Sequence, residues 1–262
     1  MSEGRLDRVM VERGLVTSRT KAARQISSGT VLVDGVVTTK PSALVDSHAT
    51  ISLTTIDQDV GQGAKKLRGA LADIPLNLSG AIAVDLGAST GGFTQVLLEA
   101  GAMTVVAIDV GHAQLAEPLR SDSRVINLEG VNVAQLGVPW WKEHSLPDPV
   151  HCVVADLSFV SLRSLITPMV ETFGVHSHYL LLVKPQFEVG KGHTTRGVVK
   201  NVALREEAVH LVAKTLREHR VTPRHVAVSP ITGEKGNVEY FVYASATPSV
   251  YPAEWDGQIP RP

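Results

Sequence analysis

The stretch that decides the fold is Ala81-Ile-Ala-Val-Asp-Leu-Gly-Ala-Ser-Thr-Gly-Gly-Phe-Thr-Gln-Val-Leu-Leu98. It predicts a buried strand, a glycine turn and then a helix. Gly87, Gly91 and Gly92 lack the Cβ atoms that would keep a ligand away from the backbone. A strand, a glycine turn and a helix in this order bind nucleotide-like ligands in α/β sheets. The stretch therefore predicts an α/β domain with such a ligand at the turn.

The spacing of the turn differs from the dinucleotide fingerprint. It has the form D-x-G-x-x-x-G-G, with Asp85 two residues before the first glycine. The next predicted strand, residues 103–109, ends in Asp109, 22 residues after Gly87. A carboxylate at that place can accept hydrogen bonds from both ribose hydroxyls. A nicotinamide enzyme would share this acid, so Asp109 alone does not separate a dehydrogenase from other nucleotide-binding enzymes.

Four polar residues lie at the ends of later predicted strands. Asn132 follows the strand that begins at Val125, and Asp156 ends the apolar run from Val150. The strand that begins at His178 ends in Lys184, and Glu239 begins the last predicted strand. Ligands of open α/β sheets bind at the carboxyl ends of the strands, so these residues are expected to converge. A lysine alone at the end of a buried strand would extend its ammonium to solvent. Because Lys184 is expected to lie beside Asp156, a functional role for Lys184 is favoured.

Composition limits the class of protein. The chain has 262 residues, of which 44% are hydrophobic, so it can bury a core without metals or disulfides. The net charge is −1, so any nucleic-acid contact must come from a local patch. The single cysteine, Cys152, excludes a disulfide framework and a multi-cysteine metal site, and we expect no metal. We see no secretory signal and no membrane-spanning stretch, so we expect a cytoplasmic protein.

The first 53 residues differ from the rest. Leu6, Val9 and Met10 share a helical face, Ser18 can cap a second helix ended by Gly29, and the Asp34-Gly35 pair suits a tight hairpin. A further short strand is expected at 49–53. Six basic residues against three acidic ones occupy the first 24 positions, which suits either phosphate binding or an ordinary solvated helix pair.

Two resemblances decide between these alternatives. The run Arg5-Leu-Asp-x5-Arg-Gly-Leu-Val-x-Ser-Arg, with the later Val-Asp34-Gly35 and Lys40-Pro41, resembles the small RNA-binding domain shared by a ribosomal protein, pseudouridine synthases and tyrosyl-tRNA synthetases. It implies RNA binding by Arg5, Arg19, Lys21 and Arg24.

The larger part resembles the TlyA-type ribosomal RNA 2′-O-methyltransferases, historically called hemolysins and related to the FtsJ-type enzymes. The resemblance rests on residues 85–93 and on the motifs Ala155-Asp-Leu-Ser-Phe, Val183-Lys-Pro-Gln-Phe-Glu and Gly236-Asn-Val-Glu-Tyr-Phe. It implies S-adenosylmethionine as cofactor and a catalytic set of Lys66, Asp156, Lys184 and Glu239. The chain departs from the family at 59–63, where an aromatic residue and an arginine before the lysine are replaced by Asp-Val-Gly-Gln-Gly.

The expected cofactor-binding residues lie in the glycine turn and at the strand ends: Asp85, Gly87, Ser89, Gly91, Gly92, Phe93, Asp109, Asn132 and Asp156. Lys184 is expected to contact the ribose 2′-hydroxyl, either as a base or as an electrostatic stabiliser. Asp156 and Glu239 are expected to orient the two lysines.

These observations predict a Rossmann-like, mostly parallel sheet whose last strand is antiparallel, behind a small α+β RNA-binding domain. The expected boundaries are 1–54, a linker at 55–63, a methyltransferase domain at 64–247 and an extended tail at 248–262. The expected function is 2′-O-methylation of ribosomal RNA, at cytidine, by a monomer that binds ribosomal RNA or subunits and no membrane. Three alternatives remain: a non-catalytic ribosome-assembly factor, a membrane-lytic protein and a nicotinamide oxidoreductase.

Overall fold

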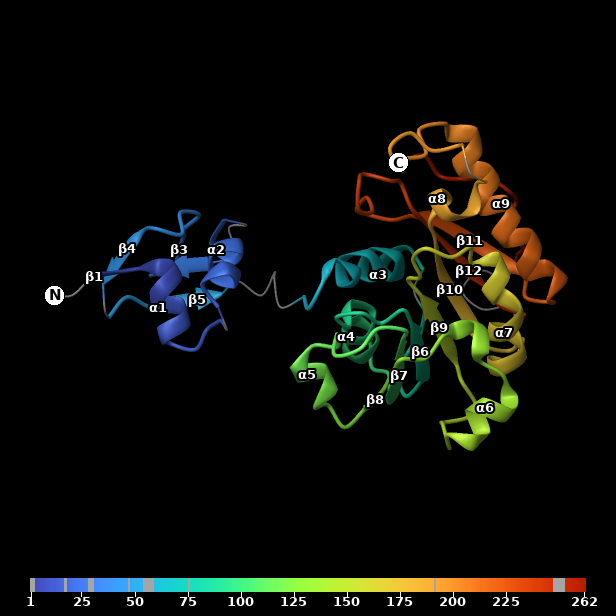
Figure 1. Cartoon of the computed structure of the whole chain (residues 1–262), viewed down its shortest axis with the longest axis horizontal. Helices are drawn as coiled ribbons and strands as arrows, with labels where there is room; N and C mark the ends of the chain where they lie inside the picture. The colour runs from blue at the N-terminus through green and yellow to red at the C-terminus, as the bar shows by residue number, and fades with distance from the viewer. Residues whose placement is uncertain are drawn as a thin grey trace. The chain divides into compact units, whose positions relative to one another are not determined.

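The computed structural model describes residues 3–16, 18–27, 31–46, 48–53, 59–74, 76–190, 192–246 and 253–262. Several sequence predictions therefore lie outside the described residues: the helix stop at Gly29, the first part of the linker (55–58), the first part of the tail and the side chain of Arg24. The chain divides into two compact units, residues 1–59 and 60–262 (Figure 1). Each unit has its own apolar core.

The small unit packs two helices on short strands. Its elements are β1 (Glu3–Arg5), α1 (Leu6–Glu12), α2 (Arg19–Ser27), β2 (Val31–Val33), β3 (Val36–Val37), β4 (Leu44–Asp46) and β5 (Ile51–Leu53). The predicted hairpin is confirmed, because β2 and β3 pair antiparallel and both Asp34 and Gly35 have positive φ angles. The pairing of β1 with β4 was not predicted from the sequence. The fully buried side chains of Leu6, Met10 and Ile26 form the centre of this core.

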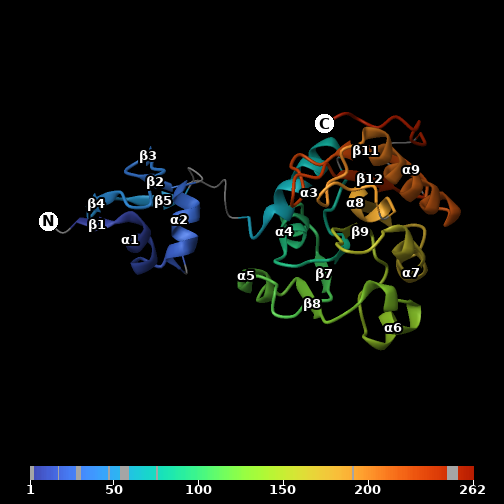
Figure 2. The ribbon, with the colours of Figure 1, turned by 45° about the horizontal axis from the view of Figure 1, so that its top comes forward.

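The large unit is built on a seven-stranded sheet (Figures 1 and 2). Its strands are β6 (Ile82–Leu86), β7 (Thr104–Asp109), β8 (Val125–Glu129), β9 (Cys152–Ala155), β10 (His178–Val183), β11 (Pro223–Val228) and β12 (Tyr240–Ala244). The spatial order is β11-β12-β10-β9-β6-β7-β8. Only β12 runs antiparallel to its neighbours, β10 and β11. The predicted mostly parallel sheet with an antiparallel last strand is therefore confirmed, although β11 was not predicted.

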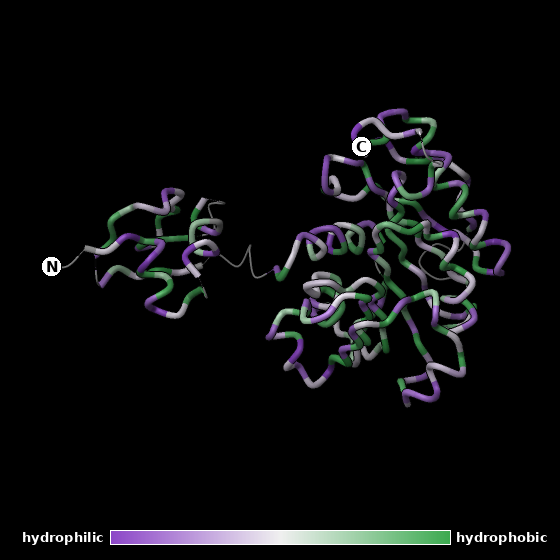
Figure 3. The backbone as a smooth tube through the Cα atoms, viewed as in Figure 1, coloured by the Kyte–Doolittle hydropathy of each residue, from purple (hydrophilic) through white to green (hydrophobic). Residues whose placement is uncertain are grey.

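Helices cover both faces of this sheet. They are α3 (Gln62–Asp73), α4 (Gly92–Glu99), α5 (Glu117–Arg120), α6 (Val138–Glu143), α7 (Arg163–Phe173), α8 (Pro185–Glu188) and α9 (Val202–Glu218), with a 3₁₀ turn η2 (Val133–Gln135). Helices α3 and α4 lie on one face, and α7 and α9 lie on the other. Figure 3 shows the central strands as largely hydrophobic, as expected of parallel strands buried on both faces. Among the described residues, no helix combines the length and apolarity needed to cross a bilayer.

The structure adds detail to the expected linker and to the expected tail. Helix α3 begins at Gln62, inside the expected linker, and the Val60 N–H donates to Gln95 Oε1 on α4 at 3.0 Å. A Cβ on Gly61 would lie 2.6 Å from Thr90 Oγ1, so residues 60–63 pack directly on the glycine turn. The described part of the tail has no helix or strand, but Trp255 is buried and stacks on His210 of α9.

Candidate active site

The glycine turn at the end of β6 is fixed by close backbone packing. Gly87 has a φ of +82°, and a Cβ there would lie 2.7 Å from the carbonyl oxygen of Asp156. A Cβ on Gly92 would lie 2.7 Å from the backbone nitrogen of Ala64, so this glycine lets α3 pack against α4. Gly91, with a φ of +96°, instead makes room for the side chains of Leu115 and Leu119. At all three positions a Cβ would collide with neighbouring protein atoms, so the glycines are needed for the packing of the turn itself.

A cavity of about 600 Å³ runs from this turn past the ends of β7 and β8. Asp109 closes the turn on one side, since its carboxylate accepts the N–H groups of Ser89 (2.8 Å) and Gly111 (2.7 Å). Asn132 caps η2 by accepting the N–H of Ala134 at 2.9 Å. The walls are largely aliphatic, with the predicted Gly87, Ser89, Asp109, Asn132 and Asp156 among the lining residues. An apolar slot with a few fixed polar groups suits an adenosyl group.

Sequence reasoning missed Glu129, which ends β8. Its carboxylate accepts the backbone N–H groups of Ala113, Gln114 and Leu115 and so holds the loop after Asp109 in place. These hydrogen bonds also hold the pKa of Glu129 below its ordinary value. The only sequence signal was an acid at the end of a strand, which Glu129 shares with Asp109.

Asp85 lies behind the glycine turn rather than in the wall of a cavity. Its side chain is fully buried, lines neither cavity and accepts the Thr94 hydroxyl of α4 at 2.6 Å. Burial without a cationic partner raises the pKa of Asp85 to about 7. Asp85 therefore fixes α4 to β6 behind the turn, and its contact with a cofactor stays a prediction.

The substitution Asp85→Asn should stabilise the protein more strongly as the pH rises. An unfolded aspartate titrates near pH 3.9, whereas folded Asp85 titrates near 7. Between these values the native state holds a proton that the unfolded chain has released, so the wild-type free energy of unfolding falls as pH rises. Asparagine avoids this cost and can still accept the Thr94 hydroxyl. At pH 8 the free energy of unfolding of Asp85→Asn should exceed that of wild type by at most about 4 kcal/mol, because a difference of three pKa units corresponds to about 1.36 kcal/mol per unit.

Urea unfolding at pH 4.5 and pH 8 measures this effect. Glu143→Gln, at an exposed carboxylate of α6, serves as the control and should show no such pH dependence. An equal difference between Asp85→Asn and wild type at both pH values would contradict the prediction.

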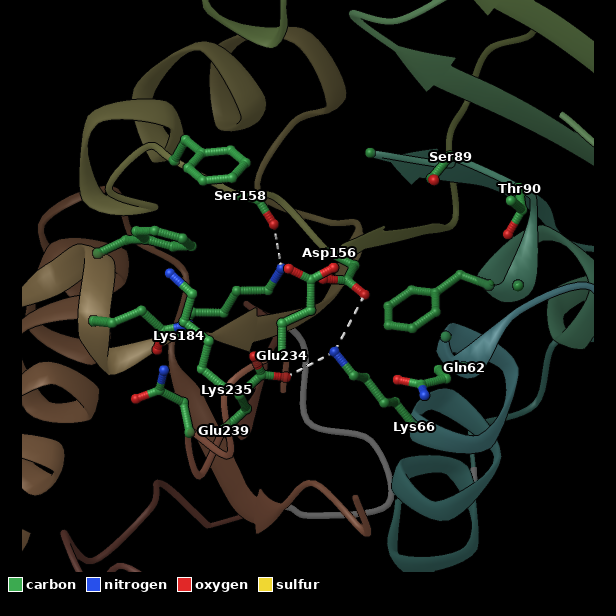
Figure 4. A pocket seen from close by; sticks show the side chains of 18 of the residues that line it. Gln62, Lys66, Ser89, Thr90, Asp156, Ser158, Lys184, Glu234, Lys235 and Glu239 are labelled. Atoms are coloured by element: carbon green, nitrogen blue, oxygen red, sulfur yellow. Dashed lines mark hydrogen bonds and ion pairs between the residues drawn. The ribbon is translucent and has the colours of Figure 1, made fainter. Parts of the chain in front are cut away.

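A second cavity, of about 640 Å³, shares Gly87, Ser89 and Asp156 with the first and contains the four predicted catalytic side chains. Lys184 Nζ lies 2.7 Å from Asp156 Oδ1 and donates to Ser158 Oγ at 2.6 Å. Lys66 Nζ donates to Glu239 Oε2 at 2.7 Å and lies 3.6 Å from Asp156 Oδ2 (Figure 4). Asp156 thus bridges two lysines, one from α3 and one from the end of β10.

The structure separates Lys66 from its neighbour Lys65. Lys66 is buried on the inner face of α3, whereas Lys65 is exposed. The predicted Gly92 and Phe93 line this second cavity, while Gly91 lines neither. Two ammonium groups, two carboxylates and a hydroxyl can hold a substrate alcohol. They can accept its proton or stabilise the negative charge that develops on its oxygen.

Phe159 was missed as a site residue, although it belongs to the quoted Ala155-Asp-Leu-Ser-Phe motif. The residue is 89% exposed, its φ is +66°, and it lines both cavities. Phe187 of α8 lies 5.5 Å away, measured between ring centroids. An exposed phenylalanine in a left-handed backbone conformation is unusual and favours a functional position.

In the small unit, the predicted RNA-binding cations differ in their partners. Asp7 is almost fully buried, and its carboxylate accepts both Arg5 and Arg19 at 3.0 Å. These contacts hold the pKa of Asp7 well below its usual range. Lys21 is exposed on α2. Arg19 therefore joins α2 to α1 through Asp7, whereas Arg5 contacts the same carboxylate from the end of β1, and both guanidinium groups stay about half-exposed.

Comparisons with known proteins agree with this architecture. Residues 60–246 match the FtsJ-like methyltransferase family, and residues 4–51 match the S4 domain. The 16S/23S rRNA (cytidine-2′-O)-methyltransferase TlyA of Mycobacterium tuberculosis is 42% identical over 242 residues, which cover 91% of this chain and 88% of the relative. Hemolysin A of Brachyspira hyodysenteriae is 32% identical over 240 residues, covering 91% and 98%.

A solved structure from Streptococcus thermophilus, whose name assigns it to the hemolysins, superposes with a TM-score of 0.70 at 31% identity. The superposition covers 96% of this chain and 92% of that one. The FtsJ-like match covers more than half of the chain, and the M. tuberculosis relative exceeds 30% identity over nearly its whole length. The chain therefore belongs to the FtsJ-like methyltransferases and carries an S4 domain before its methyltransferase domain.

Proposed function

We propose that the protein transfers the methyl group of S-adenosylmethionine to a ribose 2′-hydroxyl of ribosomal RNA, at cytidine. The observation that carries the proposal is the bridged arrangement of Lys66, Asp156, Lys184 and Glu239 in one cavity. The name of the M. tuberculosis relative supports the substrate and the nucleoside. We further propose that the protein acts as a monomer in the cytoplasm, where ribosomal RNA is its partner.

The residues of the first cavity fit the proposed cofactor. Its aliphatic walls suit the adenine ring, and Asp109 stands where a ribose would bind. Gly87 and Ser89, shared by the two cavities, would hold the end of the cofactor that faces the catalytic residues. S-adenosylmethionine supplies a methyl group on a positively charged sulfur, which becomes a neutral thioether when the carbon–sulfur bond breaks.

The side chains of the second cavity supply the remaining chemistry. The ribose oxygen must form a bond to the methyl carbon and lose its hydroxyl proton, and an alcohol is a weak nucleophile until that proton begins to leave. Lys184 is the group that contacts this oxygen, and Asp156 and Ser158 fix its amino group in position. It acts either as the base that takes the proton or as an ammonium that stabilises the oxygen while the proton passes to solvent. Glu239 holds Lys66 on the other side of Asp156, so both lysines are aimed before the substrate arrives.

The small unit is proposed to dock the RNA. Arg5, Arg19, Lys21 and Arg24 would contact phosphates, and recognition would depend on RNA shape rather than on base sequence. Pairing of Arg5 and Arg19 with Asp7 reduces their net charge but fixes the direction of both guanidinium groups. We therefore expect these two arginines to position the RNA, with Lys21 as the more freely charged contact.

Methyl transfer to isolated ribosomal subunits tests the function. The purified chain is incubated with S-adenosylmethionine carrying an isotopically labelled methyl group and with subunits from cells lacking this gene. The expected product after digestion to nucleosides is labelled 2′-O-methylcytidine, detected by mass spectrometry. Label on a base would overturn the ribose assignment, and label on another nucleoside would overturn cytidine. No label with either subunit, while S-adenosylmethionine still binds, would favour a non-catalytic assembly factor.

A further inference from the structure

The Gly236-Asn-Val segment of the last motif has a role that the catalytic set does not use. Asn237 is only 3% exposed, and both ends of its amide are engaged. Its Oδ1 accepts the N–H of Val199 at 3.0 Å, and its Nδ2 donates to the carbonyl of Gly197 at 2.8 Å. Its own carbonyl accepts the N–H of Gly233 at 2.8 Å. Asn237 therefore joins two loops, residues 194–199 and 233–236, at the mouth of the second cavity.

The second of these loops also packs on the catalytic set. A Cβ on Gly233 would lie 2.1 Å from Glu239 Oε1, so the loop backbone rests against the carboxylate that holds Lys66. Any side chain at this position would displace the carboxylate. A shift of the loop 233–236 would therefore also shift the Glu239 carboxylate.

Lys235 stands at the tip of this loop and lines the cavity. Its φ is +66°, and the loop turns there into Gly236 at +83°. Its stem lies over Gly197, where a Cβ would come 3.3 Å from Cδ and 3.4 Å from Nζ. Lys235 is exposed and forms no ion pair with any described residue. Figure 4 shows it across the cavity from Lys66.

We propose that Lys235 binds a phosphate of the RNA strand beside the target ribose, and that Asn237 is the positioning residue that holds Lys235 there. The proposal rests on the proposed function, because a ribose at Lys184 brings its neighbouring phosphate to the mouth of the same cavity. Lys66 and Lys184 are both paired with carboxylates, so Lys235 is the unpaired ammonium among the described lysines that line the cavity. An unpaired ammonium on a fixed loop suits one phosphate contact.

The salt dependence of RNA binding tests Lys235. With Lys235→Gln, the Kd for purified ribosomal RNA should rise about 3- to 10-fold, and the slope of log Kd against log salt should fall by about 0.7 to 0.9, as expected for one lost phosphate contact. Filter binding measures both quantities without methyl transfer. Lys142→Gln, at an exposed lysine of α6 away from the cavity, is the matched control and should behave as wild type. An unchanged slope for Lys235→Gln would overturn the phosphate contact.

A double-mutant cycle tests the positioning role of Asn237. Asn237→Ala should reduce the salt slope as much as Lys235→Gln, and the double variant should lose no more than either one. Asn237→Asp keeps the acceptor for Val199 and should recover part of the loss. Additive effects would show that Asn237 does not act through Lys235, and lost S-adenosylmethionine binding in Asn237→Ala would show a general structural role. A wild-type protein that binds RNA with the expected slope but transfers no methyl group would contradict only the proposed function.

Discussion

Replacing Lys184 with alanine should lower kcat for RNA methylation by about 10²- to 10³-fold, the loss typical of removing one preorganised group that stabilises developing charge. The reason is geometric. Lys184 Nζ is held by Asp156 at 2.7 Å and by Ser158 at 2.6 Å, so its direction is fixed before substrate binds. Alanine removes the contact to the ribose oxygen and also leaves Asp156, among the described residues, with only the more distant Lys66 as a cationic partner, at 3.6 Å.

Single-turnover methylation of ribosomal subunits measures this loss, and isothermal titration measures S-adenosylmethionine affinity in the same variant. The affinity should stay within about threefold, because Lys184 lines the second cavity and not the first. Lys214→Ala, at an exposed lysine of α9, controls for the loss of a positive charge. Near-normal methyl transfer by a folded Lys184→Ala protein would remove Lys184 from the catalytic set.

Deleting residues 1–53 should lower kcat/KM for ribosomal RNA by at least about 10²-fold, because several phosphate contacts are lost together. The large unit should remain folded, since the core of the small unit is a separate cluster from the two cores on the faces of the sheet. S-adenosylmethionine binding should survive, because the described residues that line the first cavity all lie between positions 87 and 165.

The deletion is assayed with the same subunits at 50 and 200 mM salt. The activity of the full chain should fall steeply with salt, whereas the residual activity of the truncated chain should depend on salt much less. A full-length variant with Lys21→Gln separates loss of charge from loss of the domain, and it should show only a small fraction of the effect. Equal activity of the truncated and full-length chains would mean that the small unit does not dock the substrate.

The sequence by itself determined the local elements and the edge of the sheet where the site lies. The buried strand, the glycine turn and the helix follow from residue periodicity and from the missing Cβ atoms of residues 81–98. Because parallel strands present their carboxyl ends at one edge, Asp109, Asp156 and Lys184 could be placed together in advance. The hairpin at Asp34-Gly35 also follows from local turn chemistry.

Only the tertiary structure decided which charges pair. Lys66 and Glu239 are 173 positions apart, and no local pattern encodes their 2.7 Å contact, which depends on α3 packing beside α4 and β11. Asp85 and Asp109 look alike in sequence, yet one is sealed behind α4 and the other closes the turn around the cavity. The periodicity of apolar residues predicts which face of a helix or strand is buried. The distance between two charges depends on how separate elements pack, so only the folded chain decided that Glu239 pairs with Lys66 and that Asp156 lies nearer to Lys184.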